Sequence, residues 1–91
     1  HLKVPTVRYT LALLQKMERR GISREEVERV MLSGLDSPAH SDRKARVAVF
    51  PFNSYRGGRW YDQKEVRVVY IEEPSDRIFV FTAVARYGRF S

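Results

Sequence analysis

The sequence has 91 residues, enough for one domain over residues 1–91, and its 43% hydrophobic content with five Tyr, five Phe and one Trp excludes a disordered chain. No apolar run approaches the ~20 residues of a membrane span, and the lack of cysteine excludes disulfides and thiolate metal sites. The net charge of +6, with 13 Arg among the 17 basic residues, favours an anionic partner such as nucleic acid, because Arg binds phosphate through two parallel hydrogen bonds. The alternative is that the arginine content reflects a GC-rich genome or a heat-adapted surface.

The first predicted element is a helix that follows a lead-in at His1–Thr6, where Pro5 forbids helix. Thr6 or Thr10 is expected to cap its start. Apolar residues recur at helical spacing at Leu11, Leu14 and Met17. Gly21 is expected to end this helix in the left-handed conformation.

A second helix is predicted directly afterwards. Ser23 and Glu26 have the spacing of a capping box, and Ile22 and Val27 have that of a hydrophobic staple. Its apolar stripe is Val27, Val30 and Met31, and Gly34 is expected to end it. The short connection makes the two helices neighbours in space.

Strands are predicted for the rest of the chain, after a polar loop at Asp36–Lys44, because the apolar period changes from helical to alternating. The expected strands are Ala45–Phe52, Arg59–Gln63, Glu65–Glu72 and Ile78–Tyr87. Turns are expected at Asn53–Gly58 and at Glu73–Asp76, and the second turn joins the last two strands as a hairpin.

This order of elements predicts an α+β fold, with two N-terminal helices packed on a three- to four-stranded, mostly antiparallel sheet. The helical residues expected to meet one face of the sheet are Leu11, Leu14, Met17, Val27, Val30 and Met31. The opposite face then needs a partner, a ligand or polar cover.

Basic and aromatic residues alternate between Ser41 and Arg67, where seven cations stand against three anions. Cations hold phosphates and aromatic rings stack on unpaired bases, so this stretch predicts a nucleic-acid-binding surface. Its candidate residues are Arg43, Lys44, Arg46, Arg59, Trp60, Tyr61 and Lys64. The alternative is a solvated sheet edge, where Lys and Arg prevent unwanted strand pairing.

Familiar catalytic signatures are absent from the sequence. There is no phosphate-binding glycine loop, and His1 and His40, the two histidines, do not have zinc-ligand spacing, so neither metal nor cofactor is expected. A ribonuclease does not require histidine, because Arg stabilises the charge of the phosphorane and Lys, Tyr or Glu can move protons.

Two parts of the chain resemble a widespread prokaryotic family of domains of unknown function. Met17–Val27 (MERRGISREEV) resembles that family's RM-x-x-R-G-I-S-x-E-E-V segment, and Val66–Glu72 with Ile78–Ala83 resemble its paired strands, which usually end in a Thr-Ala or Ser-Ala step. The family is similar to the BrnT and RelE-like toxins. The resemblance, which spans Tyr9 to Tyr87, implies two helices on an antiparallel sheet, metal-independent cleavage of free or ribosome-bound mRNA, and a small acidic antitoxin partner.

Family members commonly carry His-Ala and then Arg-Met in the first helix, where this chain has Leu11-Ala12 and Lys16-Met17, so that histidine is missing. Arg86, just after the Thr-Ala step, is the residue carried over from the toxin-like pattern.

The first functional hypothesis is a cytoplasmic, toxin-like ribonuclease without a membrane segment. Arg67 and Arg86 would hold the phosphate, with Arg43, Arg46 and Arg59 farther out. Tyr61 or Tyr87 would lie near the scissile bond. The alternatives are a non-catalytic RNA-binding module and a protein-interaction domain, in which an exposed face or edge of the sheet binds a partner.

Overall fold

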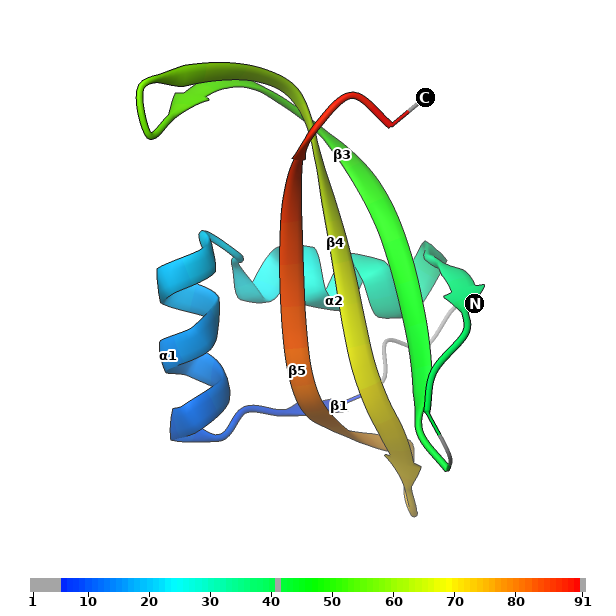
Figure 1. Ribbon diagram of the computed structural model, residues 1–91. Helices are drawn as coiled ribbons and strands as arrows, with labels where there is room; N and C mark the ends of the chain where they lie inside the picture. The colour runs from blue at the N-terminus through cyan, green and yellow to red at the C-terminus, as the bar shows by residue number, and fades with distance from the viewer. Residues whose placement is uncertain (1–5, 41, 91) are drawn as a thin grey trace.

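The computed structural model describes residues 6–40 and 42–90, in which two helices cover one face of a five-stranded mixed sheet (Figure 1). The strand order is β1-β5-β4-β3-β2. The elements are β1 (Thr6–Arg8), α1 (Leu11–Arg20), α2 (Arg24–Ser33), β2 (Leu35–Ser37), β3 (Lys44–Arg56), β4 (Arg59–Glu73) and β5 (Arg77–Gly88). Of the expected lead-in, only Thr6 lies within the described residues, and it belongs to β1.

The predicted fold class is wrong in two respects. The helices do not begin the fold, because β1 precedes them and pairs in parallel with β5, Val7 opposite Ile78. The sheet has five strands and is mixed, since β2 adds a second short strand, which pairs antiparallel with β3. Each missed strand has three residues, too few to show an alternating pattern, and the pairing of β1 joins residues about 70 positions apart.

The long central hairpin also differs from the expectation. β3 continues through the predicted turn to Arg56, and β4 joins the two predicted strands Arg59–Gln63 and Glu65–Glu72 into one. The turn itself is confined to Gly57 and Gly58, both with positive φ (61° and 79°), as a tight hairpin requires. The register shifts at a bulge between Pro51 and Ser54, and β3 continues past the proline to Arg56.

The predicted helix ends are confirmed. Thr10 caps α1 by accepting a hydrogen bond from the backbone nitrogen of Leu13 at 3.1 Å, and Gly21 follows α1 with φ 71°. Ser23 and Glu26 form the capping box of α2, with bonds of 3.1 and 2.9 Å. These contacts satisfy backbone groups that a helix end leaves unpaired.

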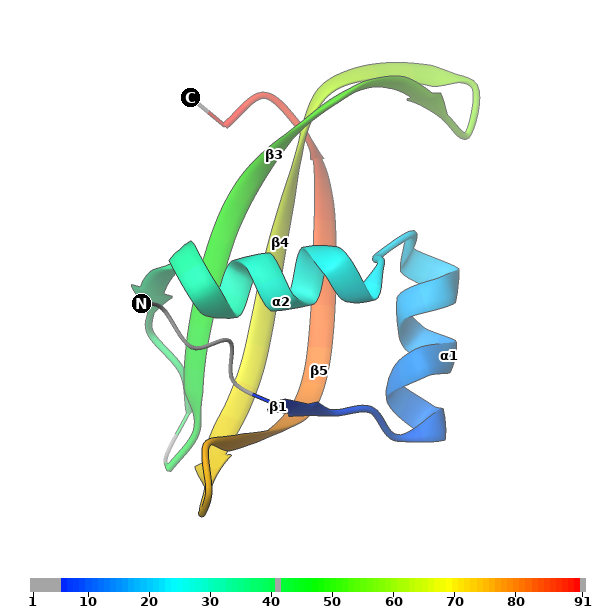
Figure 2. The same ribbon diagram turned by 180° about the vertical axis from the view of Figure 1, so that it is seen from behind.

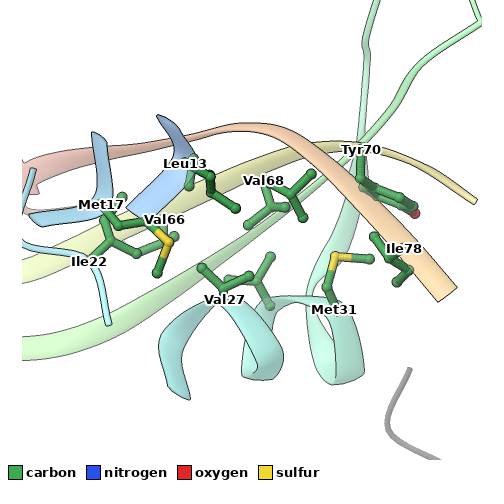
Figure 3. Packing of buried hydrophobic residues seen from close by; sticks show 12 residues of the cluster. Leu13, Met17, Ile22, Val27, Met31, Val66, Val68, Tyr70 and Ile78 are labelled. Carbon is green, nitrogen blue, oxygen red and sulfur yellow. The ribbon is translucent and has the colours of Figure 1, made fainter. Parts of the chain in front are cut away.

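The core lies between the helices and the sheet (Figure 3). Leu13 rather than Leu11 leads the apolar face of α1, since Leu13 is 1% exposed and Leu11 is 72% exposed. The other buried core residues are Met17, Ile22, Val27, Val30, Met31, Val66, Val68, Tyr70, Ile78, Val80 and Ala83. The expectation that Met17 and the α2 stripe meet one sheet face is confirmed, and Leu14 packs against this cluster.

Within residues 6–40 and 42–90, the opposite side of the sheet carries no helix. Figure 2 shows α2 crossing in front of β3 and β4, with α1 beside β5, so both helices lie on the same side. We call the helix-free side the outer face. Register and strand alternation place on it Val47, Val49, Glu65, Arg67, Ile71, Phe79, Val84 and Arg86. Among the described residues, no helix is long and apolar enough to span a membrane.

Candidate nucleic-acid interface

Two of the predicted phosphate-binding arginines are neighbours on the outer face. Arg67 of β4 pairs with Val84 of β5, and Arg86 follows Val84 by two residues on the same strand. Arg67 and Arg86 are therefore diagonal cross-strand neighbours, within reach of one another's long side chains.

The contacts of these two arginines leave one of them largely exposed. Arg86 donates through Nε to Oε1 of Glu65 at 2.8 Å, yet its side chain is 67% exposed. Arg67 donates through Nη2 to the carbonyl oxygen of Pro38 at 2.5 Å. Arg86 is the exposed member of this pair, since the Glu65 side chain is only 19% exposed. Its guanidinium group can therefore also reach an incoming phosphate, while Pro38 holds Arg67 in place.

A cationic and aromatic cluster lies beside them on the same face. The Arg43 guanidinium lies 3.9 Å from the ring centroid of Phe81, whose ring meets that of Phe79 edge-on at 5.0 Å. Arg8 of β1 lies 5.3 Å over Phe79. Arg43 directly precedes β3, so its side chain crosses the sheet to reach β5. Both rings are half-buried, and cation–π contact holds the guanidinium groups over them.

Tyr87 does not join Arg67 and Arg86. It pairs with Lys64 on the helix side of the sheet, and its hydroxyl donates to the carbonyl oxygen of Arg20 at 2.7 Å. Its ring packs against Phe52 with a centroid distance of 5.0 Å. The predicted catalytic set is thus split between the two faces of the sheet.

Three other predicted cations also lie on the helix side. Lys64 is only 4% exposed and donates to Oε1 of Glu26 at 2.8 Å and to the carbonyl oxygen of Gly21. Arg46 donates to Asp36 and to the carbonyl oxygen of Met31. Lys44 pairs with Glu72 at 2.5 Å, and this hydrogen bond raises the pKa of Lys44. The charges of Lys64 and Arg46 are engaged within the fold, whereas the pair of Lys44 with Glu72 lies at the surface.

The remaining predicted residues lie at the far end of the β3–β4 hairpin. Arg59 and Trp60 begin β4, and Trp60 is 49% exposed. Tyr61 turns inward, with its ring 5.7 Å from that of Tyr87. The predicted binding stretch therefore divides among the outer face, the helix side and the hairpin end.

Sequence reasoning missed Arg8, Phe79 and Phe81 as members of the outer-face cluster. The signal for the rings was present, because Phe79 and Phe81 alternate with the buried Ile78 and Val80 along β5. Arg8 carried no such signal, since its place depends on the parallel pairing of β1.

A contact that depends on pH lies at Asp62 of β4, near the end of the β3–β4 hairpin. Asp62 accepts hydrogen bonds from Arg89 at 2.5 Å and from the Trp60 indole nitrogen at 3.0 Å, and these bonds lower the pKa of Asp62, the Arg89 bond most. Because the pKa of Asp62 is lower in the folded protein, the contact stabilises the fold fully at pH values above the ordinary aspartate pKa. This stabilisation is lost as pH falls through the lowered pKa of Asp62.

We therefore expect the fluorescence of Trp60 to stay constant on acidification until pH falls below the ordinary aspartate pKa of about 3.9. Asp62→Asn, which keeps an acceptor oxygen but has no carboxyl to titrate, should lack this transition. A fluorescence titration of both proteins tests the expectation, and a midpoint above the ordinary aspartate value would contradict it.

No group of three or more potential metal-ligating side chains occurs within residues 6–40 and 42–90. Comparison of the chain with protein-family models, with curated proteins and with solved structures finds no match.

Proposed function

We propose that this protein binds RNA through its outer face, as a toxin-like protein of a toxin–antitoxin type system. One observation supports the proposal most: Arg43, Arg67 and Arg86 gather on a sheet face without helices, beside the half-buried rings of Phe79 and Phe81. These three arginines come from the stretches that the sequence predicted to hold phosphate.

The chemistry of this face suits a polyanion with bases. A guanidinium group binds phosphate through two parallel hydrogen bonds. The net charge of +6 attracts a nucleic acid over longer distances. A small acidic partner, which the resemblance to toxins implies, would compete with RNA for the same arginines.

A more specific version of this proposal is that the protein also cleaves the RNA that it binds. Arg67 and Arg86 would stabilise the charge of a phosphorane. Glu65, whose Oε1 lies 2.8 Å from Nε of Arg86, would accept the proton of the attacking 2′-hydroxyl, in the place first expected for Tyr87. The 2′-oxygen bonds to phosphorus as the bond from phosphorus to the 5′-oxygen breaks, and the leaving 5′-oxygen takes a proton from water. RNA binding does not need this step, so binding and cleavage can be tested separately.

The test compares two double variants by fluorescence anisotropy of labelled RNA. Arg67→Ala with Arg86→Ala is expected to weaken binding by about tenfold to a hundredfold and to reduce the salt slope by about 2, since each lost phosphate contact removes about one released counterion. Lys16→Ala with Arg29→Ala removes the same charge from the helices and is expected to change affinity little. Equal losses in both variants would contradict an outer-face site.

A cleavage assay on mRNA, with and without ribosomes, uses the unsubstituted protein and three single variants. If the protein cleaves RNA, Arg86→Ala and Glu65→Gln should abolish the products, while Tyr87→Phe should keep them. Binding without cleavage would leave the RNA-binding proposal standing and remove the ribonuclease form of it.

A further inference from the structure

A two-stranded arm extends beyond the rest of the sheet. The last residue of β5 in register is Gly88, opposite Gln63, so β3 and β4 continue past it with only each other as partners. We call the segment 52–62 the arm. Figure 1 shows it in green at the top left, curving from the sheet toward the end of α1.

Side-chain contacts join the arm to the rest of the domain. Arg56 donates through Nη2 to the carbonyl oxygen of Arg19 at 3.0 Å and lies 4.9 Å over the ring of Tyr87. The rings of Phe52 and Tyr61 pack against the same tyrosine. A two-stranded hairpin alone is marginally stable in water, so these contacts give the arm a defined direction before any ligand arrives.

The end of the arm carries aromatic surface that the fold does not use. Tyr55 and Trp60 are directly opposite in register, with ring centroids 5.2 Å apart at an interplanar angle of 77°. They are 72% and 49% exposed. The hydrogen bond from the Trp60 indole nitrogen to Asp62 orients the indole.

Two like charges also face each other at this end. Arg56 and Arg59 are direct cross-strand partners, an arrangement that destabilises a hairpin. Arg56 is engaged by a carbonyl oxygen and an aromatic ring, which do not neutralise it. The Arg59 side chain has no ion pair or hydrogen bond within the described part of the chain. An anion bound here would relieve the repulsion.

We infer that the end of the arm is a second RNA contact, in which Trp60 stacks on an unpaired base beside the edge-on ring of Tyr55, and Arg59 holds the adjoining phosphate. The inference rests on the proposed function and names its substrate class. It requires single-stranded RNA, because in a duplex the bases stack on each other and their faces are not accessible to an aromatic side chain.

The test uses the intrinsic fluorescence of Trp60, the only tryptophan in the chain. A single-stranded oligoribonucleotide is expected to quench it. A duplex of the same length and an abasic oligomer, which offers phosphates without bases, should bind without quenching it. Trp60→Ala is expected to weaken binding of the single strand by about tenfold, the effect of one lost stacked base, and to leave duplex binding unchanged. Trp60→Phe should restore most of the affinity.

The outcomes separate the arm from the outer face. RNA binding measured by anisotropy, without quenching and with equal affinity for Trp60→Ala, would overturn the role of the arm and leave the outer-face proposal intact. Quenching by polyglutamate equal to that by RNA would assign the arm to an acidic protein instead. No binding of any RNA would overturn both proposals. Circular dichroism of Trp60→Ala and Trp60→Phe checks that the fold persists.

Discussion

Replacing Leu13 by Ala is expected to lower the free energy of unfolding by about 3 kcal/mol, the usual cost of a leucine-sized cavity in a packed core. Leu13 is 1% exposed and lies in the cluster that joins α1 to the sheet. The removed side chain leaves space that its neighbours in the sheet cannot fill without moving the whole helix. Urea denaturation, followed by circular dichroism, measures the difference.

Leu11→Ala is the matched control on the same helix. The same atoms are removed from a side chain that is 72% exposed, so we expect almost no change in stability. Equal destabilisation by the two substitutions would mean that α1 packs through a different face from the one described.

Lys64→Ala is expected to cost about 3 kcal/mol, because it leaves the partners of a buried charge without their donor. Nζ of Lys64 donates to Glu26 and to the carbonyl oxygen of Gly21, so one side chain joins β4 to the connection between the two helices. Its ammonium group also lies 5.8 Å from the Tyr87 ring centroid, at the base of the arm. The same substitution should therefore loosen the arm and weaken the quenching of Trp60 by RNA.

Lys44→Ala provides the comparison for Lys64→Ala. It breaks a pair with Glu72 in which both side chains are about 60% exposed, and water replaces the lost contact. We expect its denaturation midpoint to match that of the unsubstituted protein. If Lys64→Ala were as stable as Lys44→Ala, the buried pair would not hold the helices to the sheet.

The two proposed RNA contacts differ in what the fold supplies. On the outer face, the sheet brings together arginines from separate strands, and their spacing depends on strand register. On the arm, the hairpin itself places Trp60 opposite Tyr55, and the fold supplies only its direction through Arg56 and Tyr87. Variants of the core should therefore affect the outer face first, and variants near Lys64 should affect the arm first.

The sequence predicted which types of residue form the candidate site, but not which of them lie together in the fold. Charge and aromatic content identified Arg43 and Arg67 as phosphate-binding candidates, and the resemblance to the toxin-like pattern added Arg86. The structure places these three on one face. The same criteria selected Lys64, which is buried, because a lysine that pairs with a carboxylate 38 positions away has the same local sequence signal as an exposed one.

The sequence by itself determined the features that depend on neighbouring residues. Gly21 ends α1 because it reaches positive φ without strain, Ser23 and Glu26 cap α2 through their three-residue spacing, and alternation along β5 separates its two faces. Only the tertiary structure decided the parallel place of β1, the burial of Lys64 and the division of the basic stretch into separate surfaces. Each of these depends on contacts between residues far apart in the chain, whose free energy is gained only when the whole sheet has formed.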